Sequence, residues 1–140
     1  MRLLSVLIGL FLTAVPVVMA DEGQIHLVLS GDWSGTAWDG TEVSYSFSKD
    51  GSVVWRVKEK EFMQDFLEGL KAKYQVRAGN PLCEIDMYDF KDPRFMGIRF
   101  LGIFEVADGK SFKLEGSPSN QGERPKEFSK EAIVFRANKK

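Results

Sequence analysis

Residues 43–48 read Val-Ser-Tyr-Ser-Phe-Ser, an alternation of large apolar side chains with hydroxyls. A period of two is typical of a β-strand that faces an apolar core on one side and water on the other. The pair Asp39-Gly40 precedes this stretch and predicts a tight type I′ turn, because both residue types tolerate positive φ. We therefore expect Thr36–Phe47 to form a β-hairpin.

Patterns of the same kind continue along the chain. Turn signals recur about every eight to twelve residues, which is the cadence of a sandwich or barrel, and examples are Lys49-Asp50-Gly51, Gly79-Asn80-Pro81 and Asp108-Gly109. Further alternating segments fall at 53–58, 74–78, 83–87, 98–106, 112–114 and 133–137. With about eight strands in a meander, the sequence predicts an all-β, antiparallel, up-and-down barrel.

One segment departs from this alternation. Its apolar residues recur at intervals of three and four among acidic and amide side chains: Phe62, Met63, Phe66, Leu67 and Leu70. Such spacing predicts a short amphipathic helix between two strands. We expect that helix to pack on the barrel or to close one of its mouths.

The chain begins with Met1-Arg2, continues with an apolar run from Leu3 through Val18 and reaches the small residue Ala20. This profile is typical of a secretory signal peptide. It predicts a signal at 1–20 that is cleaved after Ala20, and one domain at 21–140 in the periplasm or outside the cell. The alternative is an uncleaved anchor, because the apolar run approaches the shortest membrane spans. After cleavage no stable membrane span is expected.

Charge and residue types exclude several classes of function. The chain has 19 basic and 20 acidic residues and no basic stripe, so nucleic acid is not an expected partner. His26 is the sole histidine and Cys83 the sole cysteine, which leaves no catalytic triad and no metal-ligand spacing. Cys83 shares a strand face with Ile85 and Met87, which favours a buried position. The sequence thus predicts no catalytic residue, no metal site, no cofactor and no enzymatic activity.

The residues expected to face the barrel interior are large and mostly aromatic. As a candidate lining for a lipid, fatty acid or other apolar small molecule, we take Tyr45, Phe47, Trp55, Tyr74, Met87, Phe100, Phe104, Phe112 and Phe135. An eight-stranded barrel is just wide enough for its own side chains or for one small ligand. Two functions stay open: an exported, non-enzymatic binder of a small hydrophobic molecule, and a filled barrel that acts as a protein-interaction or structural module in the cell envelope.

Several motifs resemble a known family. Gly31-Asp32-Trp33 has the Gly-x-Trp pattern with which lipocalins open their first strand, and Gly122 to Phe128 reads Gly-x-Arg-Pro-x-x-Phe. Three further segments belong to this resemblance: Lys73-Tyr74, Pro81 before Ile85-Asp86, and residues 102–104. Together, the segments are similar to a bacterial family of small exported lipocalin-like domain proteins of unassigned activity. The resemblance extends from Leu29 to Arg136.

This resemblance implies structural roles for its motif residues. The Trp33 ring would close one end of the barrel, with Arg136 of the last strand stacked over it in a cation–π contact. The later motif, made of Gly122, Arg124, Pro125 and Phe128, has two interpretations. It forms an anchored loop with Phe128 as a lid on the barrel rim, or Arg124 binds a carboxylate or phosphate at the mouth. As a hydrophobic binder, the barrel would be gated by this loop or by the helix around Phe66.

Overall fold

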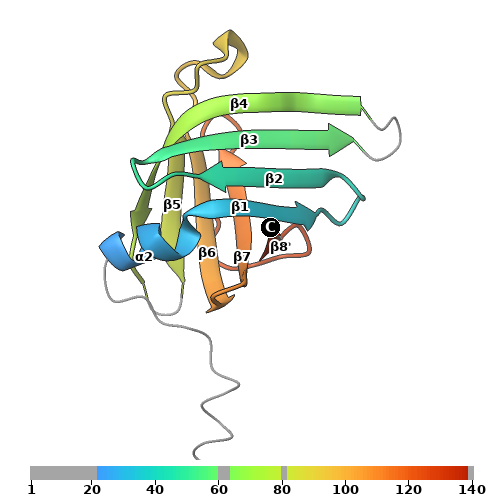
Figure 1. Cartoon of the computed structure of the whole chain (residues 1–140). Coiled ribbons are helices and arrows are strands. Elements are labelled where there is room, and N and C mark those ends of the chain that lie inside the picture. The colour runs from blue at the N-terminus through green and yellow to red at the C-terminus, as the bar shows by residue number, and fades with distance from the viewer. Residues whose placement is uncertain (1–21, 60–63, 80–81, 139–140) are drawn as a thin grey trace, which may run out of the picture.

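The computed structural model describes residues 22–59, 64–79 and 82–138. These residues form a closed barrel of eight antiparallel strands, in which each strand pairs with its neighbour in sequence and β8 pairs with β1 (Figure 1). The strands are β1 (Gly31–Thr36), β2 (Glu42–Phe47), β3 (Ser52–Glu59), β4 (Gln64–Arg77), β5 (Cys83–Tyr88), β6 (Phe100–Asp108), β7 (Ser111–Pro118) and β8 (Ile133–Ala137). The prediction of an all-β, up-and-down barrel is confirmed.

The alternation at residues 43–48 determines the two faces of β2. Val43, Tyr45 and Phe47 are buried, whereas the serines between them are partly exposed. The turn before β2 differs from the predicted type I′ turn, because among its residues only Gly40 has a positive φ, at 89°. Ala37 accepts a hydrogen bond from the amide of Gly40 and donates one to the carbonyl of Thr41. The connection is thus a three-residue hairpin loop with one left-handed glycine.

The predicted helix around Phe66 is wrong, because Gln64–Arg77 is the long strand β4. Leu67 pairs with Val57 and Leu70 pairs with Trp55, so three residues along β4 match two along β3. A β-bulge makes up this difference, and Gly69 within it has a φ of 68°. The extra residue in β4 lengthens the interval between Leu67 and Leu70 from two residues to three, which is also the spacing of a helix. Phe62 and Met63 lie outside the described residues.

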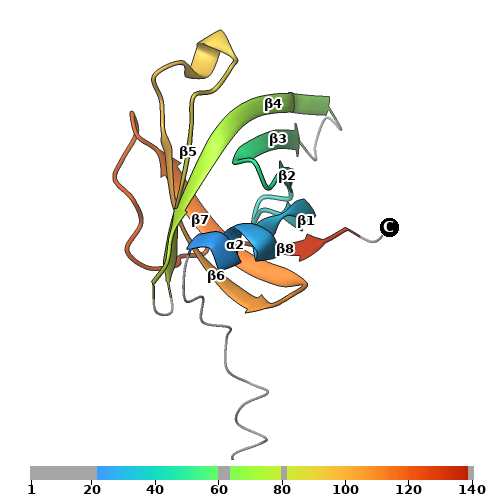
Figure 2. The same ribbon diagram turned by 60° about the vertical axis from the view of Figure 1, so that its left-hand side comes forward.

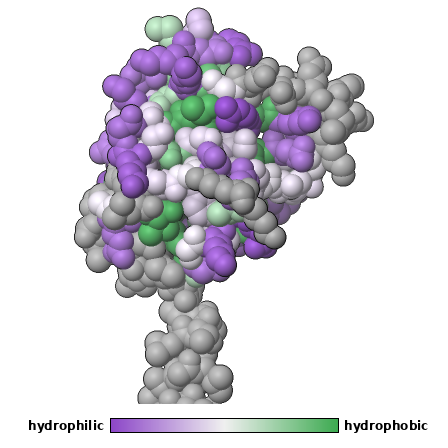
Figure 3. Space-filling view, viewed as in Figure 1, coloured by the Kyte–Doolittle hydropathy of each residue, from purple (hydrophilic) through white to green (hydrophobic). Residues whose placement is uncertain are grey.

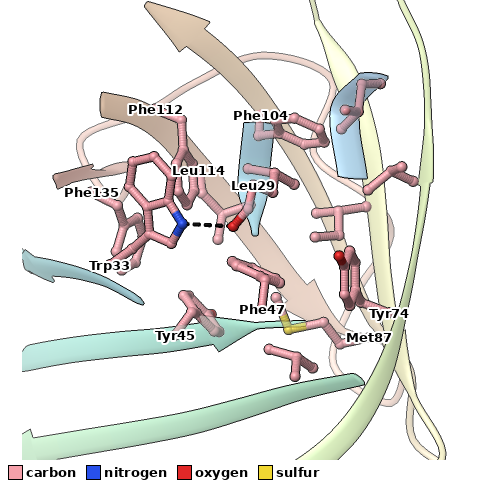
Figure 4. Packing of buried hydrophobic residues seen from close by; sticks show 14 of the residues in the cluster. Leu29, Trp33, Tyr45, Phe47, Tyr74, Met87, Phe104, Phe112, Leu114 and Phe135 are labelled. Carbon is pink, nitrogen blue, oxygen red and sulfur yellow. Dashed lines mark hydrogen bonds between the residues drawn. The ribbon is translucent and has the colours of Figure 1, made fainter. Parts of the chain in front are cut away.

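The helix that closes a mouth of the barrel is instead α2 (Glu22–Leu29), which precedes β1 and lies across one end of the sheet (Figures 1 and 2). Ile25 and Leu29, one helical turn apart, are 0% and 1% exposed and belong to the core. The indole Nε1 of Trp33 donates to the Leu29 carbonyl at 2.7 Å (Figure 4). The Leu29 carbonyl lies at the end of α2, where backbone carbonyls lack a partner within the helix. The bond to Trp33 therefore satisfies both this carbonyl and the buried indole N–H.

A second helical element lies between strands, and it contacts the core only through the partly buried Phe95. It is the 3-10 turn η1 (Pro93–Phe95), in the connection from β5 to β6 that projects from the barrel (Figure 1). No residue of η1 is buried. None of the helices in the described part of the chain is both long and apolar enough to cross a membrane.

The core occupies the inside of the barrel and is built by ring contacts between strands that are not neighbours in the sheet. The rings of Phe47 on β2 and Phe112 on β7 are 6.4 Å apart, and those of Tyr45 on β2 and Phe135 on β8 are 5.1 Å apart (Figure 4). At another level, Trp55 on β3 lies 5.6 Å from Phe100 on β6. Rings from strands two or three positions apart in the barrel therefore meet in its interior at more than one level.

Candidate functional site

The structure brings the candidate interior residues together in one cluster. Seven of them are buried: Tyr45, Phe47, Tyr74, Met87, Phe104, Phe112 and Phe135. Trp55 and Phe100 are partly buried and pack against the same cluster. The sequence pattern thus identified the interior correctly, but these side chains fill the space they line.

Polar atoms in this interior are few. The Tyr74 hydroxyl donates to the Ser48 carbonyl at 3.0 Å, and burial together with the nearby charge of Asp50 raises the pKa of Tyr74 to about 12. Burial also raises the pKa of Tyr45 far above its ordinary value. The indole Nε1 of Trp55 is buried and has no hydrogen-bond partner among the described residues. Apart from the two tyrosine hydroxyls and this unpaired indole donor, the candidate interior residues are apolar.

The first structural motif differs from the expectation in the place of Arg136. Gly31 begins β1, and Trp33 is 3% exposed inside the barrel, where it meets Phe112 edge to face at 4.8 Å. The expected stacking of Arg136 over Trp33 is wrong, because Trp33 pairs with Ala137 and Arg136 pairs with Ser34. Successive residues of a strand face opposite sides, so Arg136 lies on the outer face.

The second motif anchors a loop to the outside of the barrel. Arg124 donates from Nη1 to the carbonyls of Gly102 and Ile85 at 3.0 and 3.3 Å, and its Nη2 lies 2.7 Å from the carboxylate of Asp86. Pro125 is partly buried beside it, and Gly122 is exposed. This geometry supports the anchored-loop interpretation, because the guanidinium is engaged by the barrel wall.

Phe128 also lies against the outer wall. The Lys113 ammonium of β7 lies 4.9 Å from the centre of its ring, and Ser129 donates to the carboxylate of Glu115 on the same strand. Lys113 and Glu115 alternate with the buried Phe112 and Leu114, so they face outward. The expected lid on the barrel rim is therefore wrong, and the loop runs beside β5 and β7 (Figure 2).

Two neighbouring concavities lie on another part of the outer wall, which the sequence did not indicate. Arg136, Ser34, Ser44 and Arg56 are register partners across β8, β1, β2 and β3. Short serines between two long arginines leave a hollow. Two concavities of about 380 and 450 Å³ share Ser34, Gly35 and Thr36 and together cover these four strands. We call this surface the outer groove.

The outer groove is rich in unpaired positive charge. Its charged lining comprises Arg56, Lys58, Lys130, Arg136 and Glu42. None of Arg56, Lys58 and Arg136 forms an ion pair with a carboxylate whose side chain the structure describes, which leaves out Glu59 and the side chains of 64–68. Elsewhere in the described chain, by contrast, arginines 77, 94, 99 and 124 are all in ion pairs. The groove is thus a local excess of cations in a chain of net charge −1.

The rim of the groove carries an exposed aromatic side chain. Trp38, in the loop between β1 and β2, is 62% exposed, and the Lys130 ammonium lies 4.8 Å from the centre of its ring. The surface over β1 to β3 mixes hydrophilic and near-neutral residues, with apolar residues in small separate patches (Figure 3). This wall suits a polar ligand better than an apolar one.

Groups that carry catalysis or metal binding are sparse in the described residues. These residues include no group of three or more His, Cys, Asp and Glu side chains placed to hold a metal ion. Cys83 is 2% exposed, and its burial raises the pKa of the thiol. A buried thiol of raised pKa is a poor nucleophile, because the thiolate is the reactive form.

Comparisons of this chain with protein-family models, with curated proteins and with solved structures gave no match. The chain's own residues therefore carry every functional proposal.

Proposed function

We propose that the protein is an exported, non-enzymatic β-barrel that works through its outer surface, as an interaction module of the cell envelope. The observation that carries this proposal is the filled interior. Phe47 and Phe112 are in contact across the barrel, as are Trp55 and Phe100, while α2 covers one mouth with Ile25 and Leu29. A ligand inside would have to displace close-packed side chains, which destabilises the fold.

Export is supported by the signal profile of residues 1–20, which lie outside the described residues. The first described element, α2, begins at Glu22. Cleavage after Ala20 therefore leaves the capping helix and the whole barrel in the mature chain. The absence of an internal disulfide agrees with a fold that is stabilised by its packed core, since Cys83 is the sole cysteine.

A second candidate function, binding of a small hydrophobic molecule, is supported by one observation. The buried Nε1 of Trp55 lacks a partner among the described residues, and its ring lies among Tyr45, Phe90 and Phe100. An unpaired buried donor is destabilising. A ligand with an acceptor group at this position would satisfy it.

Native mass spectrometry of the exported protein, purified without detergent, separates the two functions. The filled barrel predicts a single species with the mass of residues 21–140 and no bound molecule, both before and after denaturation. One apolar molecule per chain that is released on denaturation would contradict it. In that case, loss of the molecule in Trp55→Phe would assign it to the indole donor.

A further inference from the structure

The outer groove carries an arginine at each end of a row of polar residues. Arg136 and Arg56 stand at the two ends of one register row, with Ser34 and Ser44 between them. The row crosses three interstrand spacings, so the two arginine Cα atoms are roughly 14 Å apart. The next pairs along the strands, Thr36 with Glu42 and Glu42 with Lys58, continue the polar surface.

The guanidinium groups at both ends are available. Both Arg56 and Arg136 are exposed, and neither is paired with a carboxylate whose side chain the structure describes. A guanidinium binds a carboxylate through two parallel N–H donors. A ligand with carboxylates at intervals along a chain would therefore gain a contact at each end of the row.

Between the arginines, the floor offers hydroxyls rather than apolar side chains. Ser34 donates its hydroxyl to the side chain of Asn138 at 2.8 Å, while Ser44 and Thr36 are partly or well exposed. Such groups exchange hydrogen bonds with the hydroxyls of a sugar. At the rim, the indole of Trp38 provides a flat apolar surface beside a polar one, which fits the C–H face of a pyranose ring.

From these features we propose that the outer groove is a binding site for an acidic glycan, a polysaccharide chain that carries carboxylates on its sugar rings. The proposal rests on the outward-acting function above and names its ligand class. A protein partner fits less well, because the centres of protein interfaces are depleted in lysine and glutamate, whereas the groove is lined by Lys58, Lys130 and Glu42. Nucleic acid fits less well in a chain of net charge −1.

The test is calorimetric titration of the mature chain with a tetramer of galacturonate and with the neutral tetramer of galactose. We expect saturable binding of the acidic tetramer alone, which weakens as salt is raised. Arg56→Gln and Arg136→Gln should each weaken binding about tenfold, since each removes a charge-assisted contact. Arg94→Gln is the matched control, because Arg94 is exposed on η1 and paired with Asp92. It should bind like the wild type.

Trp38 supplies an independent readout. Its exposed indole should change its fluorescence on binding, and Trp38→Ala should remove this change and weaken binding, whereas Trp33 and Trp55 lie inside the barrel. Thermal unfolding checks that each variant is folded.

Three results would overturn the proposal: no binding of the acidic tetramer, binding that is indifferent to both arginines, or equal binding of a glutamate tetrapeptide without dependence on Trp38. None of these results concerns the barrel interior. Failure of the glycan site is therefore distinguishable from failure of the filled-barrel function, which native mass spectrometry tests.

Discussion

Asp86 lies on the side of β5 that faces away from the core, yet it is 5% exposed. Arg77, Arg99 and Arg124 all place guanidinium nitrogens within 3.2 Å of its carboxylate. Burial alone would raise the pKa of Asp86, but hydrogen bonds from Arg124 and Arg99 and the nearby positive charges hold it below its ordinary value. Asp86 thus links β4, the segment before β6 and the loop that carries Arg124 on the outside of the barrel.

Replacement of this carboxylate should destabilise the protein. Asp86→Asn keeps the shape but leaves three guanidinium groups without their shared anion, and we expect a loss of about 3 kcal/mol in the free energy of unfolding. Urea denaturation measures it. Asp92→Asn, at an exposed ion pair with Arg94, serves as the control and should change stability little. Equal stability of Asp86→Asn and the wild type would show that the ion-pair cluster contributes nothing.

The same contact has a defined pH dependence. Because the pKa of Asp86 in the native state lies below its ordinary value of 3.8, the folded protein holds this proton less tightly than the unfolded chain. Its stabilisation is complete above that value and is lost as the pH falls through the native pKa. The difference in unfolding free energy between the wild type and Asp86→Asn should be full at pH 7 and smaller at pH 3. A difference that grows on acidification would refute this assignment.

At the scale of single elements, the helix that covers the barrel is α2 and not the segment around Phe66, which belongs to β4. The pattern around Phe66 has helical spacing, but a bulge at Gly69 produces the same interval in a strand. The bulge is a mismatch in the pairing of β3 with β4. It therefore cannot be recognised from the sequence of β4 alone. The lead-in at 22–29 has no strong amphipathic pattern, and its helix is apparent only from the mouth that Ile25 and Leu29 cover.

The position of α2 over one mouth of the barrel provides a prediction. Leu29→Ala should cost about 2–5 kcal/mol, because it opens a cavity under a fully buried position. Val134→Ala, at a 43% exposed position on the outer face of β8, should have little effect. Thermal or urea unfolding compares the two. A Leu29 variant as stable as the Val134 variant would mean that α2 does not seal the barrel.

The β-bulge at Gly69 provides a second prediction at this scale. Gly69 has a φ of 68° and Gly109 has no positive φ, yet an added Cβ would meet nothing within 4 Å at either position. Gly69→Ala should therefore cost about 1 kcal/mol through backbone strain alone. Gly109→Ala should be neutral or slightly stabilising, since it reduces the freedom of the unfolded chain. Similar unfolding free energies for the two variants would argue against the bulge.

At the scale of the whole molecule, the alternation of apolar and polar residues predicts the barrel and its interior. The alternation does not predict surfaces that form only when the barrel closes. The outer groove depends on β8 meeting β1, which sets Arg136 beside Ser34. Likewise, the Arg124 loop contacts Ile85 and Gly102, each more than twenty residues away. Residues so distant in sequence carry no local signal of their contact.

The central claim is that the wild-type barrel is full, and xenon tests it most directly. An empty apolar cavity admits apolar atoms such as xenon. Crystals of the mature protein under xenon pressure should show no xenon among Tyr45, Phe47 and Phe112, while Phe112→Ala should take it up there. Xenon inside the wild-type barrel at this place would contradict the account.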